Sequence, residues 1–202
     1  MLVEAQLSVN TTSTVILTQK LLPLLKRASS KVSGSRISPS RSAIINISSL
    51  LGSIARNDSG SSIHPVLAYR MSKAALNQFT KTLSIDLKPH NILVVSFCPG
   101  WVKTDLGGQE AFFTVEQSTT DLASSFGKLG ETHNGGFFSK TLMYYSKLEA
   151  NVCRSPNLLA RCSEFCLKFW KLNCMFLRNE RVITEEARSL IETQNHFSVD
   201  TV

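Results

Sequence analysis

The stretch "AIINIS", residues 43–48, is a short apolar run rich in β-branched side chains. A second such run, "ILVVSF" at residues 92–97, is followed closely by Pro99-Gly100. Runs of this length and composition are typical of strands buried on both faces of a parallel sheet. Between them, apolar residues recur at helical spacing up to Pro89, namely Leu76, Phe79, Leu83 and Leu87. The order strand, helix, strand predicts an α/β layered sheet with a right-handed crossover.

Other segments add to this unit on both sides. Residues 10–27 carry apolar side chains typical of a helix that faces a core, and a serine-rich loop follows. A further helix is expected at residues 115–129, because Thr114 can cap its first turn. Residues 135–140, "GGFFSK", are expected to add an edge strand.

The composition is that of a globular protein, with 202 residues, 43% hydrophobic and 18% charged. No apolar stretch is long enough for a membrane span, and no basic-then-apolar leader opens the chain, so we expect a cytoplasmic protein. The net charge of +7 is not arranged in a nucleic-acid motif, so neither nucleic acid nor a membrane is the expected partner. The histidines lack metal-ligand spacing, and no metal site is predicted.

The carboxyl ends of the two predicted strands indicate where a site would lie, because ligands of parallel α/β sheets bind there. Ser48-Ser49 follow the first strand and Cys98-Pro99-Gly100 follow the second. The helix between the strands begins with Tyr69 and Lys73, one helical turn apart. A Tyr and a Lys at this spacing are usually two surface side chains, and it is their place between these strand ends that makes them site candidates.

Three motifs in this order resemble the carboxyl-terminal half of the short-chain dehydrogenase/reductase family. They are "IINISSLLG" at 44–52, "YRMSK" at 69–73 and "CPGWVKTDLGG" at 98–108. With "LGETHNGGFF" at 129–138, they are most similar to the carbonyl-reductase branch, which includes sniffer and the C-factor proteins. The resemblance covers about residues 7 to 139. It implies a partial, Rossmann-type, doubly wound parallel sheet.

The resemblance also implies catalytic roles. Tyr69 would be the general acid/base, and Lys73 would favour its phenolate form and bind the nicotinamide ribose. Ser49, three residues before Gly52, would hydrogen-bond the substrate oxygen; by itself, such a serine is more often bonded to backbone. Asn10 would support a water-linked proton relay, or would simply be an N-cap.

The cofactor implied by the resemblance is NADP or NAD. Besides Tyr69 and Lys73, four residues would lie at its nicotinamide end: Pro99, Gly100, Val102 and Thr104. The family's glycine-rich phosphate-binding segment would precede Asn10 and is not found in the sequence. The family strands that belong beside "AIINIS" are also not found, so we expect an unpaired sheet edge there. Cofactor binding is expected to be weak or absent unless another chain supplies the rest.

The chain divides by composition into a truncated family domain, 1–140, and a divergent tail, 141–202, that resembles nothing in the family. In the tail, residues 156–177 show an amphipathic pattern that favours a helix. Such a helix would cover the truncated core, bind a partner or lie on a membrane, and we favour the first two. Cys162 and Cys166 are spaced to share one helix face, where apolar packing is commoner than metal binding.

The sequence therefore indicates an NAD(P)(H)-dependent carbonyl reductase or alcohol dehydrogenase that acts on a small carbonyl compound. The alternative is a non-catalytic truncated isoform or paralogue that acts by association with a full-length relative. The family implies that a homodimer or heterodimer would form through helices 10–27 and 71–88.

Overall fold

The computed structural model describes residues 3–61, 66–145, 174–178 and 181–182, and within them a sheet has the strand order β3-β2-β1-β4-β5. Strands β1 (Ala43–Ile47), β2 (Leu93–Cys98) and β3 (Phe137–Ser139) are parallel to one another. The first two correspond to the predicted strands, and β3 lies within the predicted edge strand 135–140. The predicted α/β layered sheet is confirmed.

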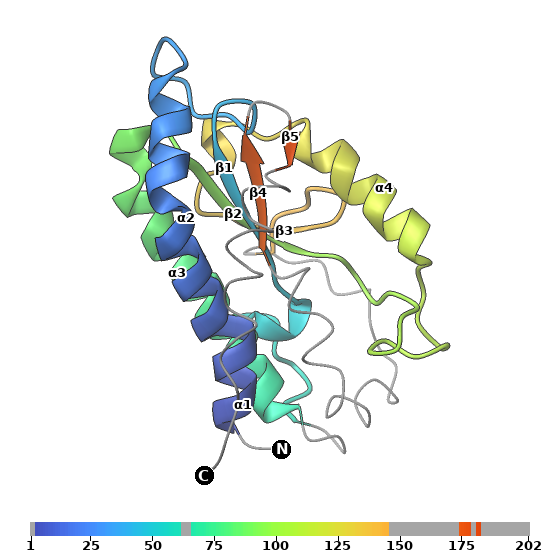
Figure 1. Cartoon of the computed structure of the whole chain (residues 1–202). Coiled ribbons are helices and arrows are strands. Elements are labelled where there is room, and N and C mark those ends of the chain that lie inside the picture. The colour runs from blue at the N-terminus through green and yellow to red at the C-terminus, as the bar shows by residue number, and fades with distance from the viewer. Residues whose placement is uncertain (1–2, 62–65, 146–173, 179–180, 183–202) are drawn as a thin grey trace, which may run out of the picture.

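Helices cover both faces of this sheet (Figure 1). Helices α2 (Ser13–Ser30) and α3 (Leu67–Asp86) pack on one face, and α4 (Val115–Phe126) packs on the other. Short 3-10 turns connect these elements at Leu50–Gly52, Lys88–His90 and Glu131–His133. None of the helices among the described residues is long and apolar enough to cross a membrane.

Alternate residues of the strands supply two separate cores, because successive side chains of a strand point to opposite faces. On the α2–α3 face, Ile44 and Val94 join Leu21, Leu25, Leu87 and Ile92. On the α4 face, Ile45, Val95 and Phe97 are among the buried residues that pack with Leu122 and Phe126. Both faces of β1 and β2 are therefore buried, as the apolar runs predicted.

The first helix begins earlier than predicted. Helix α1 (Val3–Leu7) runs into a π-helical turn, Ser8–Thr12, which continues directly into α2. Asn10 thus lies inside a continuous helical segment and is not an N-cap. At α4 the cap prediction is confirmed, since Thr114 and Gln117 form a capping box with bonds of 3.1 and 2.9 Å.

The edge of β1 that we expected to be unpaired carries a strand from the tail. Strand β4 (Cys174–Arg178) pairs antiparallel with β1 in the register Ile44↔Phe176, and β5 (Arg181–Val182) pairs antiparallel with β4. The prediction of an unpaired edge was wrong, because backbone from residues far along the chain satisfies it. The predicted helix 156–177 lies outside the described residues up to 173, and its last four residues belong to β4.

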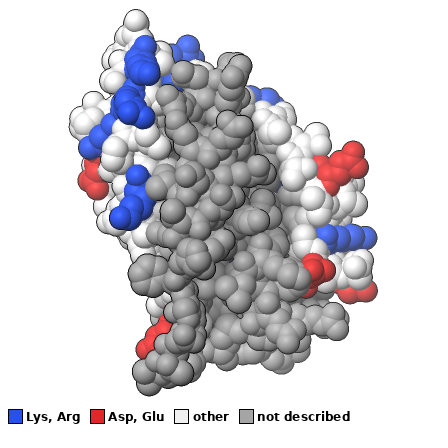
Figure 2. Space-filling model, in the orientation of Figure 1, with Lys and Arg blue, Asp and Glu red and all other residues white. Residues whose placement is uncertain are grey.

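Positive charge follows one side of the molecule. Figure 2 shows Lys and Arg side chains along the side formed by α2, which carries Lys20, Lys26 and Arg27. Acidic side chains are seen on both sides, and toward α4 they lie beside a basic one (Figure 2). Part of the surplus charge is thus spread along the solvent-facing surface of a helix.

Candidate active site

Helix α3 brings Lys73 to the carboxyl end of β1. The Lys73 side chain is only 4% exposed, and its Nζ donates a hydrogen bond to the carbonyl oxygen of Ile47 at 3.0 Å. Tyr69 lies one turn earlier, with its ring centroid 5.8 Å from Nζ of Lys73. The phenol and ammonium predicted to work together therefore lie beside each other at the end of β1.

A glycine allows the 3-10 turn after β1 to lie directly against α3. A Cβ on Gly52 would come within 2.7 Å of the Lys73 backbone carbon. Asn77 Nδ2 also donates to the carbonyl of Gly52, at 3.3 Å. This close packing fixes the turn that carries Ser49 relative to the helix that carries Tyr69 and Lys73.

The two serines after β1 have different surroundings. Ser48 is buried, and its Oγ donates to the backbone carbonyl of Lys73 at 3.4 Å. Ser49 is half-buried, and its Oγ accepts a hydrogen bond from the backbone N–H of Leu51 at 3.2 Å. Because that bond uses Ser49 as an acceptor, its hydroxyl can still donate to a substrate oxygen. Of the two, Ser49 has the more accessible side chain.

Asn10 is connected to the site through Ser72. Its Nδ2 donates to Ser72 Oγ at 3.0 Å and to Gln6 Oε1 at 2.8 Å, and Asn10 is 7% exposed. Thr11 Oγ1 donates to the Ser72 carbonyl at 2.9 Å. π-Helical turns occur frequently at functional sites. Here the turn is bonded to the residue that directly precedes Lys73.

A turn after β2, the strand next to β1, carries the other residues predicted to bind the cofactor: Pro99, Gly100, Val102 and Thr104. Gly100 has a φ of +84°, a conformation that favours glycine. Val102 forms a parallel bridge with Phe113. Thr104 Oγ1 donates to the Val102 carbonyl at 3.3 Å and accepts from the Gly107 N–H at 3.0 Å. These bonds hold the turn in shape.

Sequence reasoning missed a contact between Cys98 and Tyr145 at this edge of the sheet. Burial raises the pKa of the Cys98 thiol, while hydrogen bonds to the Gly100 and Leu50 backbone and to the Tyr145 side chain, and the Lys73 charge, act in the other direction. The Tyr145 ring lies 4.9 Å from that of Phe137, and the Arg56 guanidinium lies 5.8 Å from it. The short segment after β3 thus reaches the same strand ends.

The structure therefore brings together the turn bearing Ser49 and the side chains of Tyr69 and Lys73. It links Asn10 to them through Ser72 and puts the 99–104 turn on the neighbouring strand end. A phenol beside an ammonium is suited to proton transfer. Within the described part of the chain, no group of three or more His, Cys, Asp or Glu side chains is placed to hold a metal ion.

The family model described as short chain dehydrogenase matches residues 1–111. The chain belongs to the short-chain dehydrogenase family. Its match to the C-signal of Myxococcus xanthus is 38% identical and covers 47% of this chain and 55% of that protein.

Solved structures of carbonyl reductases of this short-chain dehydrogenase family resemble the chain as well. Sniffer of Caenorhabditis elegans is 60% identical, with a TM-score of 0.64 over 71% of this chain and 55% of that one. NADPH-bound carbonyl reductase from chicken fatty liver is 38% identical, with a TM-score of 0.64 over 68% of this chain and 52% of that one. These similarities place the chain in the carbonyl-reductase branch of the family. The chain spans about half the length of these proteins.

Proposed function

We propose that this short-chain dehydrogenase transfers hydride between a nicotinamide cofactor and a small carbonyl compound. The observation that carries the proposal is the position of Lys73, whose buried ammonium bonds to the end of β1 at 3.0 Å and lies 5.8 Å from the Tyr69 ring. Residues that serve only as solvated surface do not bury an ammonium in this way.

The proposed roles follow from the chemistry of the three side chains. A free phenol has a pKa of about 10, and a nearby positive charge favours its ionised form. Tyr69 would donate a proton to the carbonyl oxygen during reduction, with Lys73 supporting the phenolate that remains. Ser49 would hydrogen-bond the same oxygen and orient the substrate. Asn10, through Ser72, would help to hold the helix turn that carries both residues.

The turn after β2 fits the nicotinamide end of the cofactor. Gly100 has a positive φ, which turns the backbone at the carboxyl end of β2, where ligands of parallel α/β sheets bind. Pro99, Gly100, Val102 and Thr104 would hold that end, together with Tyr69 and Lys73. When bound, the cofactor supplies the hydride. Since the similar chicken carbonyl reductase is NADPH-bound, we propose NADPH as the cofactor to test first.

The test is a fluorescence titration of the purified chain with NADPH, followed by turnover of nitrobenzaldehyde. We expect binding below millimolar NADPH. Tyr69→Phe should keep this binding and lower kcat by about 10²- to 10⁴-fold, because only the transferable proton is removed. Lys73→Met should weaken NADPH binding and turnover together.

A lysine elsewhere provides the matched control for these variants. Lys20 is exposed on α2, and Lys20→Met should bind NADPH and turn over substrate as the unmodified chain does. No change in fluorescence up to millimolar NADPH would reject the proposal. So would a Tyr69→Phe variant that retains full turnover.

A specific observation also favours action by association. Three apolar residues of α3 follow helical spacing and are exposed: Leu67 (56%), Met71 (43%) and Ile85 (62%). On α2, Ile16 is 44% exposed. We propose that α2 and α3 form a dimer interface, with a second copy of this chain or with a full-length relative.

A further inference from the structure

The turn that follows β2 rests on side chains from two other elements. A Cβ on Gly100 would meet the Phe113 ring at 3.0 Å and Lys140 Cδ at 3.6 Å. Phe113 directly precedes the capping box of α4, and Lys140 directly follows β3. These two side chains therefore fix the position of the Gly100 backbone.

Backbone bonds join the same turn to the segment before α4. The Phe113 N–H donates to the Trp101 carbonyl at 3.0 Å, and the Lys103 N–H donates to the Phe113 carbonyl at 2.8 Å. Ser118 of α4 is buried, and its Oγ donates to the Pro99 carbonyl at 2.7 Å. A shift of Phe113 would consequently move the whole turn.

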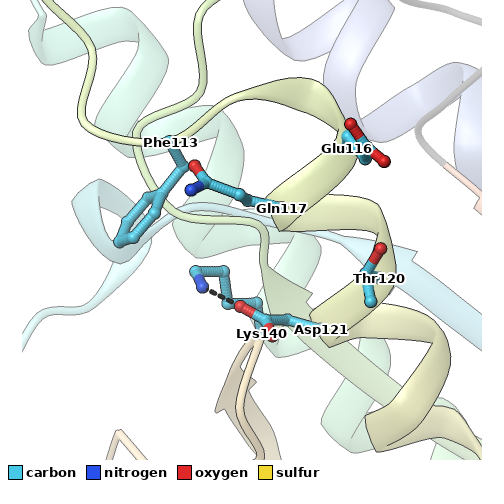
Figure 3. Close-up of a pocket in the computed structure, with 6 residues that line it drawn as sticks. All are labelled: Phe113, Glu116, Gln117, Thr120, Asp121 and Lys140. Carbon is cyan, nitrogen blue, oxygen red and sulfur yellow. Dashed lines mark hydrogen bonds and ion pairs between the residues drawn. The ribbon is translucent and has the colours of Figure 1, made fainter.

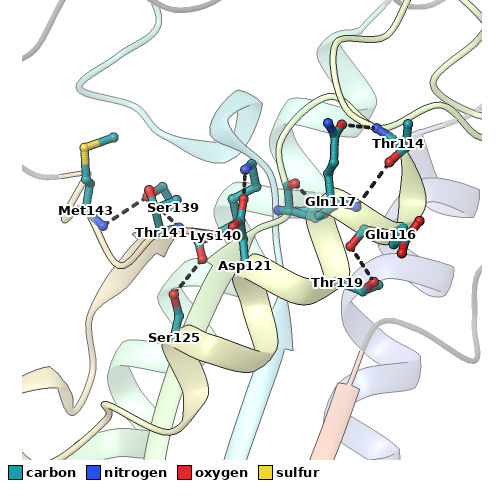
Figure 4. A network of polar contacts seen from close by, with 12 residues as sticks. Thr114, Glu116, Gln117, Thr119, Asp121, Ser125, Ser139, Lys140, Thr141 and Met143 are labelled. Atoms are coloured by element: carbon teal, nitrogen blue, oxygen red, sulfur yellow. Dashed lines mark hydrogen bonds and ion pairs between the residues drawn. The ribbon is translucent and has the colours of Figure 1, made fainter.

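An ion pair keeps Lys140 against Phe113. Lys140 is 9% exposed, and its Nζ lies 4.0 Å from the Phe113 ring centroid and is paired with Asp121 of α4 (Figure 3). Ser125 Oγ donates to the Lys140 carbonyl at 2.6 Å, which ties the same residue to α4 a second time (Figure 4). The ammonium thus meets a carboxylate and an aromatic face at once.

We propose that Lys140, Asp121 and Phe113 are positioning residues that set the distance between the nicotinamide and the carbonyl substrate. The catalytic role in this inference rests on the proposed function. The turn whose position they determine carries Gly100, Val102 and Thr104, which are the residues proposed to hold the nicotinamide end. Hydride transfer depends steeply on the distance between the reacting atoms, and a displacement of about 1 Å can cost about a hundredfold in rate.

Two variants separate the charge of Lys140 from its bulk. Lys140→Met removes the ammonium and keeps an unbranched chain, and Lys140→Arg keeps a cation that Asp121 and Phe113 can still bind. We expect Lys140→Met to lower kcat about tenfold, to increase the primary isotope effect with deuterated NADPH and to leave the KM for the aldehyde unchanged. Lys140→Arg should stay within about twofold of the unmodified chain in kcat.

A second readout needs no nucleotide. Amide hydrogen exchange of Lys103 and Phe113 reports the two bonds that hold the turn. We expect exchange to be about tenfold faster in Lys140→Met and in Asp121→Asn. The Asp121 side chain is 39% exposed, and Asn has the same size, so this substitution leaves no buried cavity. Circular dichroism melting curves establish that each variant is folded.

The control is the other ion pair among the described residues, Lys88–Glu131, at 3.8 Å and with both side chains more than half exposed. Lys88→Met should change neither exchange nor kcat. Unchanged exchange at Lys103 and Phe113 in both cluster variants would overturn the inference, even in an active enzyme. Faster exchange with unchanged kcat and isotope effect would overturn the positioning role. A chain that does not bind NADPH rejects the proposed function and this catalytic role, while exchange still decides whether the cluster holds the turn.

Discussion

Lys73 meets the requirement that a buried charge be hydrogen-bonded by using the backbone of the strand that ends at the site. Its Nζ bonds to the Ile47 carbonyl, and the same lysine's backbone carbonyl accepts from Ser48. A buried ammonium is costly unless such acceptors are present. The Lys73 ammonium and the carboxyl end of β1 therefore fix each other's position.

Cys98 makes stability depend on pH. Its thiol is 5% exposed, and burial raises its pKa, so the unfolded chain ionises first as the pH rises. The stabilisation is fully present below the unfolded thiol pKa of about 8.5 and is lost as pH rises from there toward the folded value. In that window we expect Cys98 to lower the free energy of unfolding by up to about 1.4 kcal/mol per pH unit.

Urea denaturation at pH 7 and at higher pH, for the unmodified chain and Cys98→Ala, measures this dependence. The difference between the two proteins isolates Cys98 from the cysteines of the tail. Equal losses of stability in both proteins would contradict the prediction.

At this scale, sequence patterns found the residues that stand directly after strands or within motifs. They did not find Ser72 as the partner of Asn10, since the two residues are far apart in the chain and Ser72 has no distinctive neighbours. The Lys140–Asp121 ion pair was not predicted for the same reason, because a lysine and an aspartate on separate elements have no characteristic spacing in the sequence.

At the scale of elements, Gly52 offers a sharp prediction. In Gly52→Ala, the new Cβ would lie 2.7 Å from the Lys73 backbone, so α3 and the 3-10 turn must separate. We expect the free energy of unfolding to fall by about 1–3 kcal/mol and turnover to fall with it, because overpacking displaces the turn that bears Ser49. Chemical denaturation and steady-state kinetics measure the two effects.

Gly130→Ala is the control for this substitution. A Cβ at Gly130 has nothing within 4 Å, and its φ of −163° suits any residue. This variant should retain the stability and turnover of the unmodified chain. A Gly52→Ala protein that behaves like Gly130→Ala would show that the close packing is not needed.

The elements with strong periodicity were predictable. Strands β1 and β2 are buried on both faces and therefore read as apolar runs. Helix α4 was marked by the capping residues Thr114 and Gln117. The start of the first helix was misplaced, because α1 is short and a π-helical turn, which has no sequence signature of its own, joins it to α2.

At the scale of the whole molecule, the proposed dimer makes a prediction. Replacing both Met71 and Ile85 by Glu would put charge in the proposed interface. If the unmodified chain sediments as a dimer, we expect this variant to sediment as a monomer. Ile54→Glu is the control, since Ile54 is 86% exposed in the loop after Ser49 and lies outside α2 and α3. Sedimentation velocity separates the two outcomes.

If the unmodified chain sediments as a monomer at every concentration, homodimerisation is contradicted. Co-purification with a full-length relative then tests the heterodimer, and its loss in the Met71→Glu/Ile85→Glu protein would locate the contact on α3.

The parallel pairing of β1 with β2 followed from the α/β pattern, and an edge strand was expected at residues 135–140, whereas the place of β4 was not predicted. An antiparallel strand added to a parallel sheet is specified by long-range backbone pairing, and residues 174–177 carry an apolar pattern that suits a helix as well. Local periodicity could not decide between the two.

The pairing of β4 with β1 also sets an order of events during synthesis. At translation rates of about 5–20 residues per second, β1 leaves the ribosome on the order of ten seconds before β4. During that interval the edge of β1 that β4 will occupy can pair with a strand of another polypeptide. The yield of folded protein in the cell should therefore depend on how quickly β4 is synthesised after β1, and slower translation would favour aggregation.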